Sequence, residues 1–264
     1  MEVDAKNVLK YMASNGLIAN PKKTAMIFLN TKTEVPIIIK IGEDTVVQEQ
    51  KAKLLGITFN EKQDWKDQLY GKGGMLSSLN QRLFLIRSLQ NVMNKKALIK
   101  IADGIFMSKI RYGLQLLGKV RLAKEDPSNE VLSAIQLSQN KLVRLLNGKT
   151  LKDKISTEVL LTNIGMASVN QIHCQIKLLE IWKAVNIQNN PIKVTSATSC
   201  IDSAKTRSGG NERLVEHGKS NLSSKTFIND ATKIWNRAPK ELKECTTLNS
   251  AKKAIKLFSK SLPI

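Results

Sequence analysis

The 264-residue chain has few cysteines, and their spacing excludes two common uses of this residue. Cys174, Cys200 and Cys245 are odd in number, lie far apart and include no C-x-x-C pair. A disulfide framework needs paired cysteines, and a structural zinc site usually takes closely spaced pairs of ligands. The sequence therefore predicts neither a disulfide-stabilised domain nor a zinc-binding module.

Long hydrophobic runs are also missing. No apolar stretch approaches the roughly 18 residues that a transmembrane helix needs. The first four residues, Met1-Glu2-Val3-Asp4, are acidic, whereas the start of a secretory signal peptide is basic. We therefore expect an intracellular protein that does not span a membrane, and both a nuclear and a cytoplasmic location remain open.

Acidic residues are scarce, with 22 against 42 basic residues and a formal net charge of +20. Such an excess favours a polyanionic partner, either nucleic acid or an anionic membrane surface. A helix that lies on a membrane should carry large aromatic side chains beside its lysines. The most basic part of this chain has only Phe84, Phe106 and Tyr112, so nucleic acid is the better prediction.

Most catalytic patterns are absent. The loop of residues 71–74, Gly-Lys-Gly-Gly, lacks the spacing of a phosphate-binding P-loop. No closely spaced acidic pair follows an apolar strand, so we predict no metal ligands and no cofactor within this chain. His173 and His217 are interpreted as packing or surface residues.

Basic residues concentrate between residues 72 and 124, where eleven of them accompany one acid, Asp103. A solvated helix face normally mixes both signs, because Glu–Lys pairs at i,i+4 support the helix. This imbalance predicts contacts with phosphates. The predicted nucleic-acid-binding residues are Lys72, Arg82, Arg87, Lys95, Lys96, Lys100, Lys109, Arg111 and Lys119.

Periodicity predicts a mostly α-helical protein with a small α+β N-terminal part. A helix through Ala5 and Met12 should stop at Asn15-Gly16. Strands are expected at residues 24–29, 36–41 and 53–59. From Trp65 onward the apolar residues recur at helical spacing. The four predicted helical stripes are Leu76, Leu79, Leu83, Ile86 and Leu89; Ala102, Phe106, Ile110, Gly113 and Leu117; Leu132, Ile135, Leu142 and Leu146; and Val169, Ile172, Ile176, Leu179 and Trp182.

The C-terminal third changes character. Residues 195–225 hold ten Ser or Thr and three Gly, a composition typical of a linker. Two further helices are expected at residues 227–236 and 248–262, separated by the helix breaker Ala238-Pro239. The predicted segments are therefore 1–62, a mixed part; 63–190, a basic helical part; 191–225, a linker; and 226–264, a helical tail.

Several short motifs resemble the reverse transcriptases of non-LTR retrotransposons, especially the jockey-like group. Their order along the chain is the order of that family. The matching residues are Asn20-Pro21-Lys22-Lys23-Thr24, which resembles N-x-x-K-T; the strand and turn of residues 36–42; Lys53-Leu54-Leu55-Gly56-Ile57, which resembles the primer-grip hairpin; Trp65; Tyr112-Gly113; Gln139 with Arg144; and Phe227, Ala231, Trp235, Asn236 and Pro239 of the tail.

This resemblance implies part of a right-hand polymerase palm, then a helical thumb and a C-terminal tail. It implies a phosphate-contacting or general-acid role for Lys23, which the motif places near the phosphates of the incoming nucleotide. Leu55 and Gly56 would belong to the primer grip. The Tyr-x-Asp-Asp turn that holds catalytic Mg²⁺ is not in this sequence, so we expect the chain to bind RNA and DNA as template–primer without extending it.

Two other functions remain open at this point. The chain could be part of an active RNA-directed DNA polymerase that upstream sequence completes with its Mg²⁺ site. It could instead be a basic helical interaction protein, or one that lies on a membrane surface. An upstream reading frame with an intact Tyr-x-Asp-Asp motif would decide for the first alternative.

Overall fold

The computed structural model describes residues 2–18, 20, 23–29, 36–41, 44–62, 64–192 and 227–264. The chain is mostly helical with a small region of two β-hairpins, which confirms the predicted balance of mostly α with a small β part. It forms two compact units, Met1–Met75 and Leu76–Ile264.

The first unit begins with helix α1 (Glu2–Ser14), which contacts the first strand of the chain. Leu9 and Met12 are half-buried on one side of this helix. The helix ends before Gly16, whose φ of +71° is a conformation that glycine adopts without a steric penalty. The predicted helix and its stop are confirmed.

Four short strands form two separate antiparallel hairpins. In the first hairpin β1 (Ile38–Ile41) pairs with β2 (Asp44–Val47). In the second, β3 (Lys51–Leu54) pairs with β4 (Ile57–Asn60). The predicted strand over residues 36–41 is thus confirmed at residues 38–41, and β2 was not predicted from the sequence.

The predictions of single strands over residues 24–29 and 53–59 were wrong. Residues 53–59 form no single strand, because the chain reverses at Leu55 and Gly56, whose φ values are +49° and +79°. Two successive positive φ angles are typical of a type I′ turn, which matches the twist of a two-residue hairpin. Within the described residues, residues 24–29 form no strand, and Met26 makes an isolated parallel bridge with Gln48.

Helix α2 (Lys66–Tyr70) packs against β4 and closes the small core of the first unit. The side-chain carbonyl of Gln68 accepts a 2.8 Å hydrogen bond from the backbone N–H of Thr58. Leu69 and Val46 are buried in this unit. The core is small, and many apolar side chains of the unit stay exposed, among them Val3, Val8, Tyr11, Leu17, Ile18, Leu29, Ile38, Val47 and Leu54.

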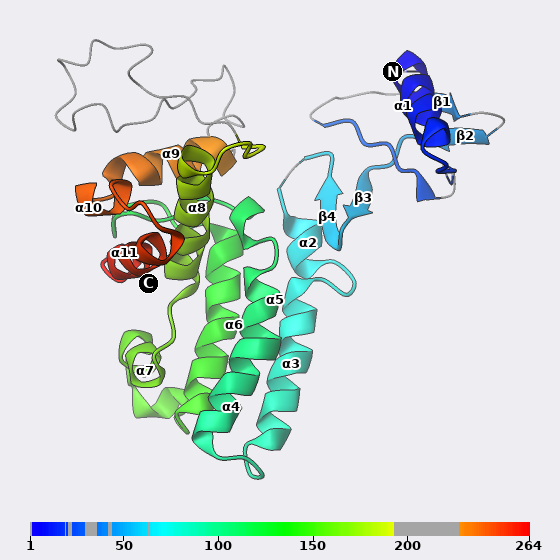
Figure 1. Ribbon diagram of the computed structural model, residues 1–264. Helices are drawn as coiled ribbons and strands as arrows, with labels where there is room; N and C mark the ends of the chain where they lie inside the picture. The colour runs from blue at the N-terminus through cyan, green and yellow to red at the C-terminus, as the bar shows by residue number, and fades with distance from the viewer. Residues whose placement is uncertain are drawn as a thin grey trace. The chain divides into compact units, whose positions relative to one another are not determined.

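The second unit is built on a bundle of helices that lie side by side (Figure 1). They are α3 (Met75–Leu89), α4 (Lys95–Ala102), α5 (Ser108–Arg111) and α6 (Glu130–Leu146). Asparagine side chains begin two of them: Asn94 accepts from the backbone N–H of Ala97, and Asn129 from that of Val131. The apolar stripes meet inside the bundle, where the buried residues include Leu79, Ile86, Leu98, Phe106, Ile110, Ile135 and Leu142.

The helix predicted from the stripe of Ala102 to Leu117 ends sooner than expected. A five-residue π-turn, Asp103–Met107, joins α4 to α5, and the helix stops at Arg111. Tyr112 is extended and Gly113 has a φ of +73°, so the chain leaves the helical path there. Leu117 is buried as the stripe requires, but it follows a short 3₁₀ turn and is not part of the helix.

The rest of the unit comprises α7 (Thr157–Ile164), α8 (Val169–Asn186), α9 (Phe227–Arg237), α10 (Lys240–Lys243) and α11 (Leu248–Ser259). The stripe that predicted α8 is confirmed, as are the two C-terminal helices and the break at Ala238-Pro239. The short helices α7 and α10 were not predicted from the sequence.

Helices α9 and α11 both pack on α8 (Figure 1). Trp182 and Trp235 are buried in the core that they share, together with Leu178, Ile234, Ala251 and Ile255. The C-terminal helices therefore belong to the second unit, although the sequence analysis treated residues 226–264 as a segment of their own. Residues 193–226, which include nearly all of the predicted linker, lie outside the described part of the chain.

Candidate nucleic-acid interface

The predicted nucleic-acid-binding residues differ in their exposure. Lys72 is exposed in the loop before α3. Lys95, Lys96 and Lys100 are exposed on α4, and no described residue forms an ion pair with them. Lys109 on α5 and Lys119 in the following loop are half-buried. The structure thus leaves α4 as the main exposed carrier among the predicted positions.

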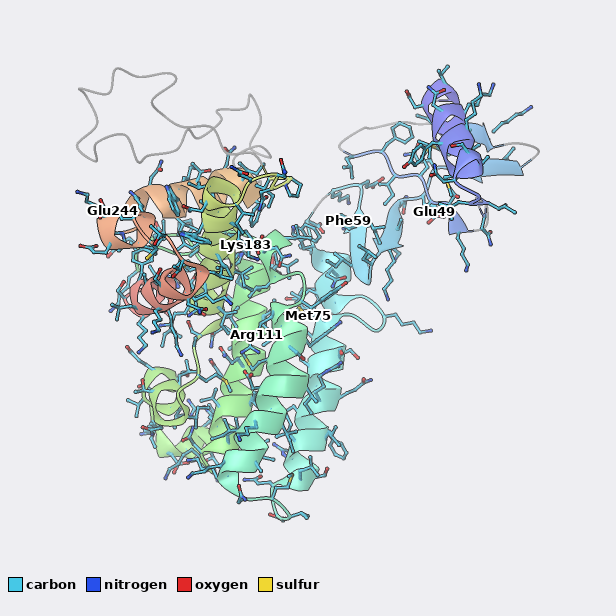
Figure 2. The ribbon with its side chains drawn as sticks, viewed as in Figure 1. Glu49, Phe59, Met75, Arg111, Lys183 and Glu244 are labelled. Atoms are coloured by element: carbon cyan, nitrogen blue, oxygen red, sulfur yellow. The ribbon has the colours of Figure 1, made fainter. Side chains whose placement is uncertain are left out.

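Two of the predicted arginines are used within the fold. The Nε of Arg82 donates a 2.8 Å hydrogen bond to the carbonyl of Ile105 in the π-turn, and its Nη1 contacts Ser78 one turn earlier on α3. Arg111, labelled in Figure 2, pairs with Asp103 at an Nη2–Oδ1 distance of 2.5 Å. Arg82 therefore ties α3 to the π-turn, and Asp103 offsets the charge of Arg111.

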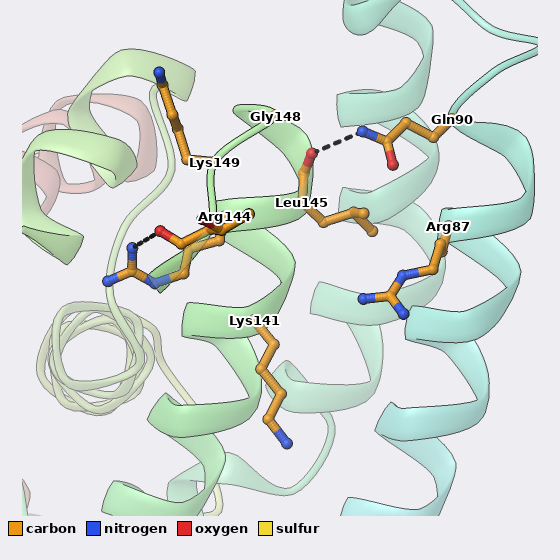
Figure 3. A pocket seen from close by; sticks show the side chains of 8 residues that line it. Arg87, Gln90, Lys141, Arg144, Leu145, Gly148 and Lys149 are labelled. Carbon is orange, nitrogen blue, oxygen red and sulfur yellow. Dashed lines mark hydrogen bonds between the residues drawn. The ribbon is translucent and has the colours of Figure 1, made fainter. Parts of the chain in front are cut away.

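A basic cleft lies between the C-terminal ends of α3 and α6 (Figure 3). Its volume is about 490 Å³. Arg87 of α3 and Gln90 just after that helix form one side, and α6 with the loop after it forms the other. The residues that line the cleft are Arg87, Gln90, Lys141, Arg144, Leu145, Gly148, Lys149 and Thr150, which include four basic side chains and no acid.

Hydrogen bonds hold the walls of the cleft in place. The Nη1 and Nη2 of Arg144 donate to the carbonyls of Thr150 and Ile155, at 3.1 and 3.2 Å. Across the cleft the side-chain amide of Gln90 donates to the carbonyl of Leu145 at 3.4 Å, which joins the two helix ends. The loop after α6 is thereby fixed as one wall.

Arg87 and Lys141 are the cations of the cleft that remain available. Figure 3 shows Arg87 extending from α3 toward α6, and Lys141 extending from α6 into the same opening. Neither side chain forms a hydrogen bond or ion pair with a described residue. Lys149 forms a long ion pair with Asp153, at an Nζ–Oδ1 distance of 3.8 Å. An anion in the cleft would therefore meet unpaired positive charge from both helices.

A second hollow adjoins the cleft and extends its basic surface. It has a volume of about 210 Å³ and shares Gln90, Leu145 and Gly148 with the cleft. Lys95, at the start of α4, lines its far side. The two hollows together place basic side chains from α3, α4 and α6 at one end of the bundle.

The basic residues predicted from the sequence did not include Lys141, Arg144 and Lys149, which line the cleft. The charge count ended at residue 124, and Arg144 had no predicted role beyond its place in a helix motif. A signal was present, because residues 131–149 contain these three basic residues and no acid. That the end of α6 lies beside the end of α3 is a tertiary fact that spacing along the chain does not contain.

The residues to which the polymerase resemblance gives a nucleotide or primer-grip role, Lys23, Leu55 and Gly56, lie in the first unit. Lys23 is exposed, and its backbone N–H donates to the carbonyl of Asn20 at 3.0 Å. Its neighbours Pro21 and Lys22 lie outside the described residues. Leu55 and Gly56 form the turn of the second hairpin. A hairpin is therefore present at the predicted primer-grip position, while its role stays a prediction.

Within the described ranges, no three His, Cys, Asp or Glu side chains gather in a way that could hold a metal ion. These residues do not fit a Mg²⁺ centre, and we assign no catalytic step through one to them. Among the described helices, none is both long enough and apolar enough to cross a bilayer.

His173, which the sequence suggested as a packing residue, is buried on α8. Burial, and then the nearby charge of Lys177, holds the pKa of its imidazole well below the ordinary value of 6.5. The folded protein thus keeps this ring neutral, as a packing role requires. The other histidine, His217, lies outside the described residues.

We predict that His173 makes the folded state less stable in acid. The unfolded chain binds a proton at this residue below about pH 6.5, whereas the folded chain does not. The free energy of unfolding should therefore fall as the pH drops from about 7 toward 5, by up to about 1.4 kcal/mol per pH unit. Urea unfolding of the wild type and of His173→Leu at several pH values measures how much of the pH dependence comes from His173. An equal pH dependence in both proteins would contradict it.

The described residues thus combine an open basic cleft with an exposed basic helix beside it. Such a surface can neutralise several phosphates without reading their bases. Comparison with known proteins does not identify a family for this chain. No family model, no curated protein and no solved structure matches it.

Proposed function

We propose that the second unit binds nucleic acid through the basic end of its helical bundle, by contacts with backbone phosphates. The observation that carries this proposal is the cleft between α3 and α6, whose lining has four basic residues and no acid. The cations that face it, Arg87 and Lys141, have no acidic partner among the described residues. Binding of this kind is independent of sequence and depends strongly on salt.

We further propose that the nucleic acid is a template–primer, and that the chain derives from the palm, thumb and tail of a non-LTR reverse transcriptase. The support is the order of the short motifs and a hairpin at Leu55-Gly56, where that family has its primer grip. The second unit would then act as the thumb. Lys23 would contact nucleotide phosphates only in a protein that also holds the catalytic carboxylates and Mg²⁺.

A structural explanation of the same basic residues has to be separated from this proposal. Arg87 and Arg144 lie in the last turns of α3 and α6. Positive side chains at these positions stabilise a helix through its dipole, by about 0.3–1 kcal/mol each. Such a role would leave nucleic-acid affinity unaffected when the charges are removed, so an affinity measurement distinguishes the two.

The test is a binding titration with a fluorescently labelled nucleic acid, followed by anisotropy at low salt. The double variant Arg87→Gln, Lys141→Gln removes the two unpaired charges of the cleft. We expect its affinity to fall roughly tenfold to 100-fold at about 50 mM salt, since each phosphate contact releases close to one counterion.

The matched control removes two exposed charges from another helix, with Lys252→Gln and Lys253→Gln on α11. Both variants have the same net charge, so a general effect of net charge would weaken them equally. An equal loss in the two proteins would show that the cleft is not the interface. A loss confined to the cleft variant supports it.

A further inference from the structure

Helix α3 carries an exposed aromatic side chain, Phe84, whose exposure is not accounted for by phosphate binding in the cleft. Phe84 is 74% exposed, although Leu79 and Ile86 on the same helix are fully buried. It makes no ring contact with another described aromatic residue. Large aromatic side chains are among the residues that contribute most to binding where they lie in an interface.

The surroundings of Phe84 favour an anionic partner. Helix α3 contains no acidic residue, and its other exposed positions near Phe84 are Asn80, Gln81, Leu85, Arg87 and Ser88. The nearest charge along that side is Arg87, three residues on. The net charge of the chain, +20, disfavours a second copy of the same protein as the partner.

Phe84 also lies close to the basic cleft. Residues three apart on a helix share a face, with their Cβ atoms about 5–6 Å apart. Phe84 is not part of the cleft lining, but it lies one turn before the cleft residue Arg87 on α3. A phosphate and a base of one nucleotide are separated by a comparable distance, so both features can serve one nucleotide.

We infer that this surface takes a nucleotide with an unpaired base, with its phosphate between Arg87 and Lys141 and its base stacked on Phe84. The inference rests on the proposed function and narrows the ligand at this surface to single-stranded segments, such as the unpaired part of a template. In a duplex the bases already stack on one another and cannot lie flat on the ring. Stacking on an aromatic side chain tolerates every base, so no sequence preference is expected.

The experiment compares single-stranded and double-stranded DNA of equal length, each labelled with the same dye, by anisotropy titration. Phe84→Ala should weaken binding of a single-stranded oligothymidylate roughly 5- to 150-fold, the range for loss of one stacked base. Binding of the duplex should change less than about twofold, because phosphate contacts are left intact. Phe84→Trp should keep or strengthen single-strand binding, since it retains a π-face.

Leu257→Ala is the matched control, because Leu257 is 72% exposed and apolar but lies on α11. It should change neither affinity. Loss of both affinities to the same degree in Phe84→Ala would overturn the stacking inference and indicate a general effect on the bundle. An unchanged single-strand affinity would overturn it as well.

Two further outcomes separate this inference from the proposed function. If the cleft variant Arg87→Gln, Lys141→Gln loses affinity while Phe84→Ala does not, the stacking inference fails and phosphate binding stands. If the wild-type protein binds neither DNA, the proposed function itself fails. Light scattering on wild type and Phe84→Ala adds a third check, because dissociation of an oligomer in the variant would make Phe84 a protein contact and overturn base stacking.

Discussion

Raising the salt concentration from about 50 to about 200 mM is expected to weaken nucleic-acid binding on the order of 10³-fold. This size follows if roughly six phosphates are neutralised, because each neutralised phosphate releases close to one condensed counterion. Arg87 and Lys141 in the cleft, with Lys95, Lys96 and Lys100 on α4, supply about that number of exposed cations. The measurement is a set of anisotropy titrations, plotted as log affinity against log salt.

Charge reversal on α4 should flatten that plot. In the triple variant Lys95→Glu, Lys96→Glu, Lys100→Glu the slope should fall by about 0.9 for each lysine that contacts a phosphate. The control reverses three exposed lysines of α11, Lys252, Lys253 and Lys256, and should keep most of the slope. An unchanged slope in the α4 variant would remove α4 from the interface.

The helices of the second unit could be predicted from the sequence because apolar residues recur with the period of the helix. The stripe that ends at Leu146 predicts α6, and the stripe that ends at Trp182 predicts α8. These residues are buried against other helices, so packing and local pattern require the same conformation. Gly16 and Pro239 similarly mark chain reversals that depend on backbone chemistry alone.

The sequence failed where tertiary structure or a turn decides the conformation. The apolar run of residues 53–59 suggests one strand, yet the positive φ at Leu55 and Gly56 divides it into a hairpin. The stripe that ends at Leu117 gives the buried residues correctly but cannot report the π-turn at Asp103–Met107 or the extended Tyr112. Apolar spacing measures burial, and burial continues after the helix has ended.

The candidate site was only partly predictable for a similar reason. An excess of basic residues between 72 and 124 points to Arg87 and Lys95, which do line the hollows at the end of the bundle. The same count also includes Arg82 and Arg111, which the fold uses for its own hydrogen bonds and ion pair. Charge along a sequence cannot separate these uses, because the difference lies in what each guanidinium contacts.

A buried ion pair far from the basic cleft joins the C-terminal helices to the rest of the second unit. The Nζ of Lys177 on α8 lies 2.6 Å from the Oδ2 of Asp230 on α9, and the two side chains are 1% and 7% exposed. Lys177 also donates to the carbonyl of Gly118 at 3.0 Å, and Asp230 accepts from the backbone N–H of Val120 at 3.2 Å. Three segments of the chain meet at this pair.

Burial lowers the pKa of Lys177, and the charge of Asp230 partly offsets that effect. Each charge is therefore tolerated in the core because the other is present. The variant Asp230→Ala leaves the ammonium of Lys177 buried without its counter-charge. We expect the free energy of unfolding, measured by urea denaturation, to fall by about 3–5 kcal/mol.

The double variant Lys177→Met, Asp230→Leu separates the loss of a partner from the loss of the α8–α9 contact. Apolar residues of similar size often replace a buried ion pair without net loss of stability, so the double variant should recover most of the stability that Asp230→Ala loses. As a control, Glu180→Ala removes the partner of Lys183 in a half-exposed pair on α8, which should cost at most about 1 kcal/mol. If Asp230→Ala costs no more than this control, the pair does not hold α9 in place, and the attachment of the C-terminal helices depends on the apolar contacts of Trp182 and Trp235 alone.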